Sequence, residues 1–361
     1  MSAATPTRDV LAGKLPVSLI TGFLGSGKTT LLRHLLRDPR MNRAAVIINE
    51  FGEVGIDHEL VAASSEQMTL LANGCLCCAV RTDLQETLRE LFIRRRAGEV
   101  IDFDRVFVEA SGLADPVPVL HALQTDSMLG AQYRLDCVVT LVDAVNGPRN
   151  LDDAPEAAKQ AAVADRIVIT KSDIATPEAV AALQTRLEQM NPYAARVVAV
   201  NGEVDVAFLR DVGPRSTRAT SAELDRWLSP SGEVRPADGA YLGKRVRAGA
   251  HDSSIRSFCL WFDRPFTWDT FSAAAQVLTS LRGPDLLRVK GIVNVEGEPG
   301  PVVVQGAQHV FHPPVTLDAW PGADRRSRIV FITRNLTRES VAALFAAVGS
   351  LAAPSASSID R

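Results

Sequence analysis

Residues 22–29 read Gly22-Phe-Leu-Gly-Ser-Gly-Lys28-Thr29, between the apolar run Leu15–Ile20 and the apolar-periodic stretch Thr30–Leu36. The spacing is that of a phosphate-binding loop, G-x-x-x-x-G-K-[ST], in the order strand, loop, helix that this loop requires. Its backbone N–H groups and the positive end of the following helix dipole converge on phosphate oxygens. Glycines are needed because a Cβ would block the close approach of the phosphate. The stretch predicts a nucleoside triphosphate site.

The residues of this loop have separate expected roles. The Lys28 ammonium should reach the β- and γ-phosphates, and the Thr29 hydroxyl should bind Mg²⁺. Backbone groups of the loop and the first helical turn supply the remaining phosphate contacts. The residues expected to make them are Gly22, Gly25, Ser26, Gly27 and Thr30.

Length and composition narrow the class of protein. At 361 residues the chain exceeds the usual size of one domain, so we expect two. Hydrophobic residues make up 46% and charged residues 22%, which is typical of a globular protein in water. No apolar run reaches the roughly 18 residues of a membrane span, and the first residues lack a signal-peptide core. We therefore expect a cytoplasmic protein without membrane partners, and the net charge of −3 gives no reason to expect nucleic-acid binding.

Apolar, β-branched runs alternate with helical stretches over residues 14–212. Such continuous rather than alternating hydrophobicity is typical of strands buried on both faces of a parallel sheet. The expected strands are Leu15–Ile20, Ala45–Ile48, Val106–Val108, Cys137–Val142, Arg166–Ile169 and Val197–Val200, and the expected helices are Thr29–Leu36, Asp83–Arg95 and Glu178–Met190. The alternation predicts an α/β fold, a P-loop NTPase domain with a mainly parallel sheet.

A second, smaller unit follows. Periodicity fades over residues 213–250, which we interpret as a linker with one short helix at Ala222–Leu228. Residues 251–351 predict an α+β C-terminal domain, and residues 352–361 a flexible tail. Its expected strands are Ser257–Phe262, Leu287–Val295, Val302–Phe311 and Arg328–Ile332, and its expected helices are Trp268–Leu281 and Ser340–Leu351.

Two further strand ends carry residues suited to a nucleotide site. The strand Val106–Val108 leads into Glu109 and, three residues later, Gly112. A carboxylate at the carboxyl end of a strand beside the phosphate loop is placed to hold Mg²⁺ or its water, and the Gly112 N–H could contact the γ-phosphate. A solvated glutamate at a strand end is the alternative for Glu109 considered alone.

The strand Arg166–Ile169 leads into Thr170-Lys171-Ser172-Asp173. The Asp173 carboxylate could accept from both the ring N–H and the exocyclic amine of guanine, a donor pair that adenine lacks. Lys171 should lie along the base with its aliphatic stem. The spacing resembles the Asn-Lys-x-Asp signature of GTPases, with Thr170 where that signature has Asn. This loses an amide that bridges base and loop, so we expect modest affinity. An ordinary polar turn is the alternative.

The cysteines are concentrated in Asn73-Gly-Cys75-Leu-Cys77-Cys78. Three thiolates at this spacing can wrap one soft or borderline cation such as Zn²⁺, Cu(I) or Co²⁺, but a tetrahedral site needs a fourth ligand. Glu50, after the strand Ala45–Ile48, is a candidate. Redox thiols and buried structural cysteines are the alternatives. Cys137 and Cys259 lie in apolar strands and should be core residues.

The six histidines are less informative. His309 and His312 have a spacing close to that of metal ligands, although a structural or exposed role is the better interpretation for each.

Together these residues resemble the CobW-like GTPases of metal homeostasis, a branch of the P-loop GTPases, over nearly the whole chain. The resemblance rests on Gly22–Thr29, Asn49-Glu50-Phe51-Gly52, the cysteine cluster, Glu109–Pro116, Thr170–Asp173, and Arg288-Val-Lys-Gly291 with Val304-Gln-Gly306. It implies a cytoplasmic GTPase that binds a transition metal at Cys75, Cys77, Cys78 and Glu50 and delivers it to a client metalloprotein. GTP, Mg²⁺ and Zn²⁺ or Co²⁺ are the implied cofactors, with zinc the first choice. A homodimer is one assembly to consider.

The resemblance also implies a link between the two sites. The family's switch elements correspond to Asn49–Gly55 and Glu109–Pro116, and the cysteines lie between them in sequence. If the γ-phosphate orders these segments, thiolates and Glu50 converge on the metal, and hydrolysis releases them. No residue in these motifs is an evident base for activating water, so slow hydrolysis is expected.

One departure from the family is the absence of a histidine-rich run near the domain junction, where this chain has only His251. Metal storage or scavenging is therefore not the expected role. Three other functions stay open at this point: a metal sensor or storage protein with a vestigial nucleotide site, an ATP-driven scaffold for metal-cluster assembly, and a small-molecule kinase.

Overall fold

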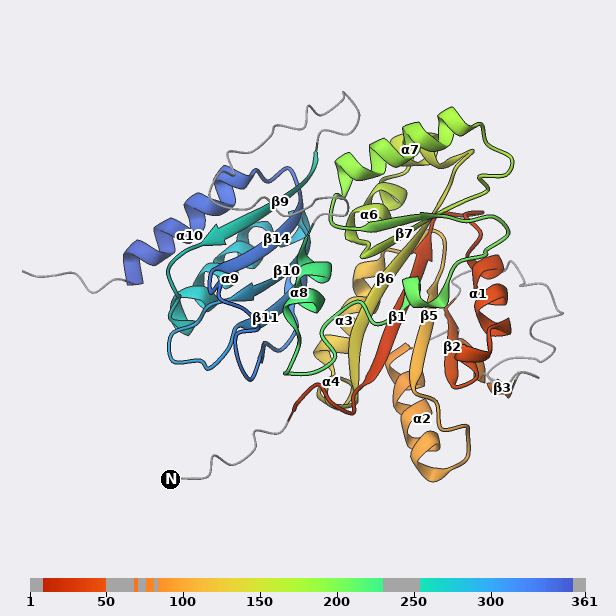
Figure 1. The fold of residues 1–361 in the computed structure, drawn as a ribbon, viewed down its shortest axis with the longest axis horizontal. Helices are drawn as coiled ribbons and strands as arrows, with labels where there is room; N and C mark the ends of the chain where they lie inside the picture. Colours follow the sequence, from red (N-terminus) through yellow and green to blue (C-terminus); the bar gives the residue numbers. More distant parts are fainter. Residues whose placement is uncertain (1–8, 50–67, 71–75, 81–83, 230–253, 353–361) are drawn as a thin grey trace, which may run out of the picture. The chain divides into compact units, whose positions relative to one another are not determined.

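The computed structural model describes residues 9–49, 68–70, 76–80, 84–229 and 254–352 (Figure 1). The chain forms two compact units, Met1–Ser253 and Ser254–Arg361. Each unit is described separately below. None of the described helices is long and apolar enough to cross a membrane.

The first unit is built on one eight-stranded sheet in the order β3-β4-β2-β5-β1-β6-β7-β8. Neighbouring strands are parallel except for the antiparallel pair of β3 and β4. The strands are β1 (Leu15–Gly22), β2 (Ala44–Asn49), β3 (Met68–Leu70), β4 (Leu76–Val80), β5 (Arg105–Ala110), β6 (Tyr133–Asp143), β7 (Arg166–Thr170) and β8 (Ala195–Val198). This confirms the predicted α/β fold with a mainly parallel sheet, and the central strands are buried as their continuous hydrophobicity predicted.

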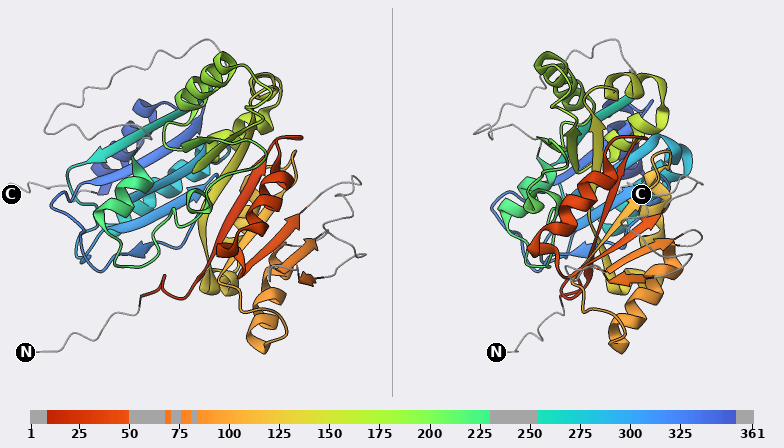
Figure 2. Two further views of the ribbon diagram at one scale, coloured as in Figure 1. Left: turned by 45° about the vertical axis from the view of Figure 1, so that its right-hand side comes forward. Right: turned by 90° about the vertical axis from the view of Figure 1, so that its right-hand side faces the viewer.

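Helices connect these strands, and in Figure 2 the first helix lies against the sheet beside β1. The helices of the first unit are α1 (Lys28–Arg37), α2 (Leu84–Ala97), α3 (Pro116–Thr125), α4 (Ser127–Gln132), α5 (Gly147–Asp153), α6 (Pro155–Val163), α7 (Pro177–Met190) and α8 (Ser221–Leu228), with 3₁₀ turns η1 (Pro39–Met41) and η2 (Val206–Leu209). The sequence predicted α1, α2, α7 and α8. It missed α3 to α6, which have ten residues or fewer and too few turns for a clear apolar period.

Residues 213–229, predicted as part of a linker, are attached to the first unit. The Asp9 carboxylate accepts hydrogen bonds from the Ser216 hydroxyl and the Thr217 N–H. Within this segment Thr220 and Glu223 form a capping box at the start of α8, which buries Trp227. These contacts give residues 213–229 a defined structure, although the sequence there lacks a clear hydrophobic periodicity. The domain boundaries at 212, 250 and 351 stay predictions.

The second unit has a six-stranded sheet in the order β12-β11-β10-β14-β9, with β13 paired to β11, and all of these pairs are antiparallel. Its elements are β9 (Ile255–Phe262), α9 (Trp268–Arg282), η3 (Gly283–Asp285), β10 (Leu286–Val293), β11 (Val302–Ala307), β12 (Val310–Phe311), β13 (Val315–Thr316), β14 (Ser327–Arg334) and α10 (Arg338–Ala352). Phe271 of α9 and Phe345 of α10 share one core with Leu260 and Phe331 of the sheet. The predicted α+β class is confirmed.

One predicted strand of this unit is wrong. Val302–Phe311 was expected to be continuous, whereas β11 and β12 form a hairpin. The chain reverses at Gln308, whose φ is 52°, and His309 is exposed at the turn. Neither residue is the Gly or Asn that would have indicated a left-handed turn position.

Candidate functional site

The phosphate loop leaves the end of β1 and enters α1 directly. Gly22, Gly25 and Gly27 have φ of 145°, 71° and 94°, values that favour glycine. A Cβ on Gly22 would lie 2.5 Å from the Leu141 carbonyl oxygen of β6. The loop therefore fits tightly against the neighbouring strand, and only glycine meets both demands at this position.

The start of α1 is arranged to receive an anion. Gly27 precedes the helix and provides no side-chain cap, and the first turn contains no acidic residue. The Lys28 ammonium lies over the loop, where Nζ donates to the carbonyls of Gly22 at 2.9 Å and Phe23 at 3.4 Å. A cation and the N–H groups of a helix start thus face the same loop, which is the chemistry that phosphate binding needs.

Glu109 and Gly112 lie beside this loop. In the register of β5 and β1, Glu109 is paired with Ile20, which lies two residues before Gly22. The Glu109 side chain is buried, with an exposed fraction of 2%. A Cβ on Gly112 would lie 2.9 Å from the backbone nitrogen of Leu24. The turn after β5 therefore touches the phosphate loop directly. A buried carboxylate on the strand beside β1 and a hydroxyl at the start of α1 are both oxygen ligands, the kind that Mg²⁺ prefers.

The end of β7 is also tied to the phosphate loop. Thr170 is 5% exposed, and its hydroxyl donates to the Ser26 carbonyl at 2.8 Å. From the sequence we expected Thr170 to lose a link between residues 170–173 and the phosphate loop, but its hydroxyl makes one. Lys171 has a left-handed backbone with φ of 56°, and Asp173 is exposed at the same turn.

Asp143, at the end of β6, belongs to this group of residues and was not predicted. It is 3% exposed, and its carboxylate accepts from Lys171 Nζ at 2.7 Å and from the Val145 N–H at 2.7 Å. Burial opposes its ionisation, but hydrogen bonds from Lys171, Asn146 and two backbone N–H groups outweigh burial and lower the pKa of Asp143. An acid at the end of an apolar run, the signal that identified Glu109, was present here as well.

Two of the four predicted metal ligands lie on a described strand. Glu50 and Cys75 fall outside the described residues. Cys77 and Cys78 lie on β4, where their backbones are paired with Val46 and Ile47 of β2. The strand that leads to Glu50 is therefore the neighbour of the strand that carries two of the cysteines. Within the described ranges, no three His, Cys, Asp or Glu residues are grouped in a way that could hold a metal ion.

Cys137, Cys259 and His309 have structural surroundings. Cys137 is fully buried in β6. Burial raises the pKa of the Cys259 thiol to about 12, so this thiol is unreactive at neutral pH. The His309 ring contacts the Thr279 carbonyl in the last turn of α9 through Nδ1, at 3.1 Å. His309 thus stabilises a helix end, in line with the structural interpretation of this residue.

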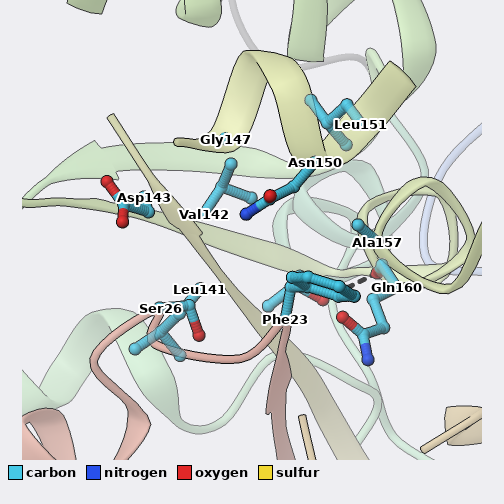
Figure 3. Close-up of a pocket in the computed structure, with 11 residues that line it drawn as sticks. Phe23, Ser26, Leu141, Val142, Asp143, Gly147, Asn150, Leu151, Ala157 and Gln160 are labelled. Carbon is cyan, nitrogen blue, oxygen red and sulfur yellow. Dashed lines mark hydrogen bonds between the residues drawn. The ribbon is translucent and has the colours of Figure 1, made fainter. Parts of the chain in front are cut away.

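A small pocket lies behind the phosphate loop (Figure 3). We call it the rear pocket. It is lined by Phe23 and Ser26 of the loop, Leu141 to Asp143 of β6, and Gly147, Asn150, Leu151, Ala157 and Gln160 of α5 and α6. Phe23 also packs against the hydrophobic cluster of α5, α6 and α7. The phosphate loop and α6 therefore line the same pocket.

Comparison with protein families agrees with these observations. Residues 16–198 match the model of the CobW/HypB/UreG nucleotide-binding domain, and residues 255–349 match the cobW C-terminal domain of cobalamin synthesis proteins. The resemblance stated from the sequence is thereby confirmed.

Several curated proteins are similar over most of the chain. The zinc chaperone YjiA of Escherichia coli is 32% identical over 92% of this chain and 98% of its own. The zinc chaperone CobW of Pseudomonas aeruginosa is 32% identical over 91% and 90%. The zinc-regulated GTPase metalloprotein activator 1 of Saccharomyces cerevisiae is 28% identical over 91% and 82%. Among solved structures, Zn(II)-bound YjiA GTPase from E. coli aligns with a TM-score of 0.70 and 30% identity, covering 93% of this chain and 99% of that one.

Proposed function

Because the chain belongs to the CobW/HypB/UreG family, we propose that it is a GTPase metallochaperone that binds a transition metal and delivers it to a client protein. The observation that carries the nucleotide half of this proposal is the meeting of three strand ends. The phosphate loop after β1 contacts Gly112 after β5 and Thr170 at the end of β7. Ligands of open α/β sheets bind at such carboxyl ends.

The proposed hydrolysis uses the residues of this edge. Lys28 and the backbone N–H groups of residues 22–30 stabilise charge on the transferring phosphoryl group. Thr29 and Glu109 would hold Mg²⁺, which when bound neutralises charge on the phosphate oxygens. Asp173 selects guanine through its two acceptor oxygens. No residue of these motifs is an evident base for activating water, so we expect slow turnover.

The metal half rests on the cysteine cluster and on the relatives' names. Cys75, Cys77, Cys78 and Glu50 are the proposed ligands, since thiolates and a carboxylate suit Zn²⁺ and, second, Co²⁺. Three relatives are named as zinc chaperones or a zinc-regulated activator, which favours zinc as cargo. We propose that the protein acts in the cytoplasm on a client metalloprotein and that the triphosphate state binds metal more tightly than the diphosphate state. Linkage requires that bound metal shifts nucleotide affinity by the same factor.

A single experiment tests this coupling. Zinc is titrated into the full chain loaded with a non-hydrolysable GTP analogue and, separately, with GDP. We expect tighter binding in the triphosphate form. Equal zinc dissociation constants in both forms would remove the coupling and favour a sensor or storage protein with a vestigial nucleotide site.

Two variants separate the sites. Cys77→Ala should weaken zinc binding and leave GTP binding largely intact, whereas Lys28→Ala should do the reverse. Competition between GTP and ATP for the site distinguishes the proposed GTPase from the two alternatives, an ATP-driven scaffold and a small-molecule kinase. Asp173 predicts that GTP binds more tightly than ATP. Displacement by ATP at equal or lower concentration would favour one of those rivals.

A further inference from the structure

Gln160 of α6 makes a buried connection to the turn that follows β5. Its side chain is fully buried, and Nε2 donates to the carbonyl oxygens of Gly112 and Ala114, both at 3.1 Å. The backbone of Gln160 is held by the sheet, because its carbonyl accepts a hydrogen bond from the Thr140 hydroxyl of β6 at 2.7 Å. One amide group thus holds two carbonyls of a turn that lies more than forty positions earlier in the chain.

The neighbouring residue holds the far end of the same turn. The Lys159 ammonium donates to one oxygen of Asp115. The other oxygen of Asp115 accepts from the Val117 N–H at 3.0 Å and caps α3. Consecutive residues of α6 therefore anchor both ends of the turn formed by residues 112–115.

The opposite side of this turn touches the phosphate loop. Gly112 is so close to Leu24 that a Cβ would lie 2.7 to 3.0 Å from three of its atoms, two of them in the backbone. The turn is therefore held between the phosphate loop and α6. Figure 3 shows that Gln160 of α6 and Phe23 of the phosphate loop line the same rear pocket.

We propose that Gln160 is a positioning residue that sets the preference of this site for a triphosphate over a diphosphate, with Lys159 in a supporting role. The inference rests on the proposed nucleotide function, in which the Gly112 N–H contacts the γ-phosphate. Gln160 lies behind the turn and acts only through Gly112 and Ala114. Two hydrogen bonds from one buried amide fix the carbonyls of Gly112 and Ala114, and with them the backbone that directly follows the Gly112 N–H, before the nucleotide arrives. A preformed donor has less conformational freedom to lose on binding the γ-phosphate.

The informative change is Gln160→Glu, which keeps the size of the side chain and removes the N–H donors. A carboxylate facing two carbonyl oxygens repels them, so the turn should move away from its place beside Leu24. We expect the affinity for a non-hydrolysable GTP analogue to fall about tenfold, of the order expected for losing a pair of buried hydrogen bonds. The affinity for GDP should stay within about twofold, since GDP lacks the phosphate that Gly112 contacts.

A matched control is available on α2. Gln85 is half-buried, and its Nε2 also donates to a backbone carbonyl, that of Ala122 at 3.2 Å. Gln85→Glu makes the same chemical change away from the turn and should leave the ratio of GDP to GTP-analogue dissociation constants at the wild-type value. A purely structural role for Gln160 would lower the melting temperature without changing this ratio.

Two further variants keep the test decisive. Gln160→Met removes the N–H donors without adding charge. Lys159→Met removes the partly exposed ammonium that holds Asp115, and it should change the ratio of GDP to GTP-analogue dissociation constants in the same direction but by less. A wild-type ratio in every Gln160 and Lys159 variant that folds would overturn the inference. Failure of the wild-type chain to bind either guanine nucleotide would instead overturn the proposed function itself, so the two failures are distinguishable.

Discussion

The hydroxyl of Thr170 donates a hydrogen bond to the backbone carbonyl of Ser26 at 2.8 Å. This bond joins β7, which leads into the proposed base-recognition turn, to the phosphate loop. Thr170 is buried, so the bond is shielded from water. A hydroxyl therefore makes a link that the sequence comparison with the Asn-containing signature had suggested was lost.

Thr170→Val should weaken binding of both GDP and GTP. The change keeps the shape of the side chain and removes the donor, which leaves the Ser26 carbonyl without this partner. A loss of about 1 kcal/mol, or roughly fivefold in affinity, is expected for one buried neutral hydrogen bond. Thr185→Val is the control, because Thr185 is exposed on α7 and its hydroxyl donates to the Ala181 carbonyl of the same helix. Isothermal titration with each nucleotide measures the effect, and an unchanged affinity in Thr170→Val would show that the link does not contribute to binding.

Gly112→Ala should reduce triphosphate binding more than diphosphate binding. The new Cβ would lie 2.9 Å from the backbone nitrogen of Leu24 and 3.0 Å from its Cα, so backbone must shift on one side. Gly130→Ala in α4 is the control, because its Cβ would meet only the Leu123 carbonyl oxygen at 3.8 Å, an ordinary contact. Equilibrium binding of a fluorescent GTP analogue and of GDP decides the case. Equal losses for both ligands would mean that Gly112 only maintains the loop.

The sequence predicted those residues of the candidate site that belong to a short, recognisable sequence motif or directly follow an apolar strand. The phosphate loop needs glycines and a lysine at fixed spacing, and Glu109 and Thr170 follow apolar strands directly. Parallel strands bring their carboxyl ends to one edge of a sheet, so these residues were expected to meet, and the register of β1 with β5 and the bond from Thr170 to Ser26 bring them together.

Gln160 and the pairing of Asp143 with Lys171 were beyond the sequence argument for a physical reason. Gln160 lies on α6, a nine-residue helix rich in alanine that gives no clear apolar period, and its bonds reach residues 46 and 48 positions away. A buried amide in a helix has no local signature, because its partners are backbone carbonyls of a distant turn. Strand order and helix placement must be known before such contacts can be seen.

Asp143→Asn should destabilise the first unit at neutral pH and much less in acid. Burial opposes ionisation of Asp143, but its hydrogen bonds, with that from Lys171 foremost, lower its pKa in the folded state. A lowered folded pKa contributes stability that is present above the unfolded value of about 4 and is lost as pH falls through the folded value. The difference in melting temperature between the wild type and Asp143→Asn should therefore be largest near pH 7, begin to shrink below about pH 4, and disappear below the lowered pKa of the folded state.

Lys171→Met provides the second arm of that measurement. If the ion pair is the source of the effect, the double variant should be less destabilised than the sum of the two single changes, because each single change already removes the pair. A pH-independent difference between wild type and Asp143→Asn would instead assign the effect to packing at the end of β6.

Asp173→Asn should change which purine base is bound. The Asp173 carboxylate offers two acceptors for the ring N–H and the exocyclic amine of guanine, and one of these becomes an N–H donor in the amide. Xanthine carries a carbonyl in place of the exocyclic amine, so the amide should lose affinity for GDP by at least tenfold and gain affinity for XDP. Asp153→Asn is the control, since Asp153 is an exposed acid at the end of α5 that pairs with Arg149. Competition of GDP and XDP for the same labelled nucleotide gives the two constants directly, and an Asp173→Asn variant that keeps the wild-type order of preference would mean that the base is read elsewhere.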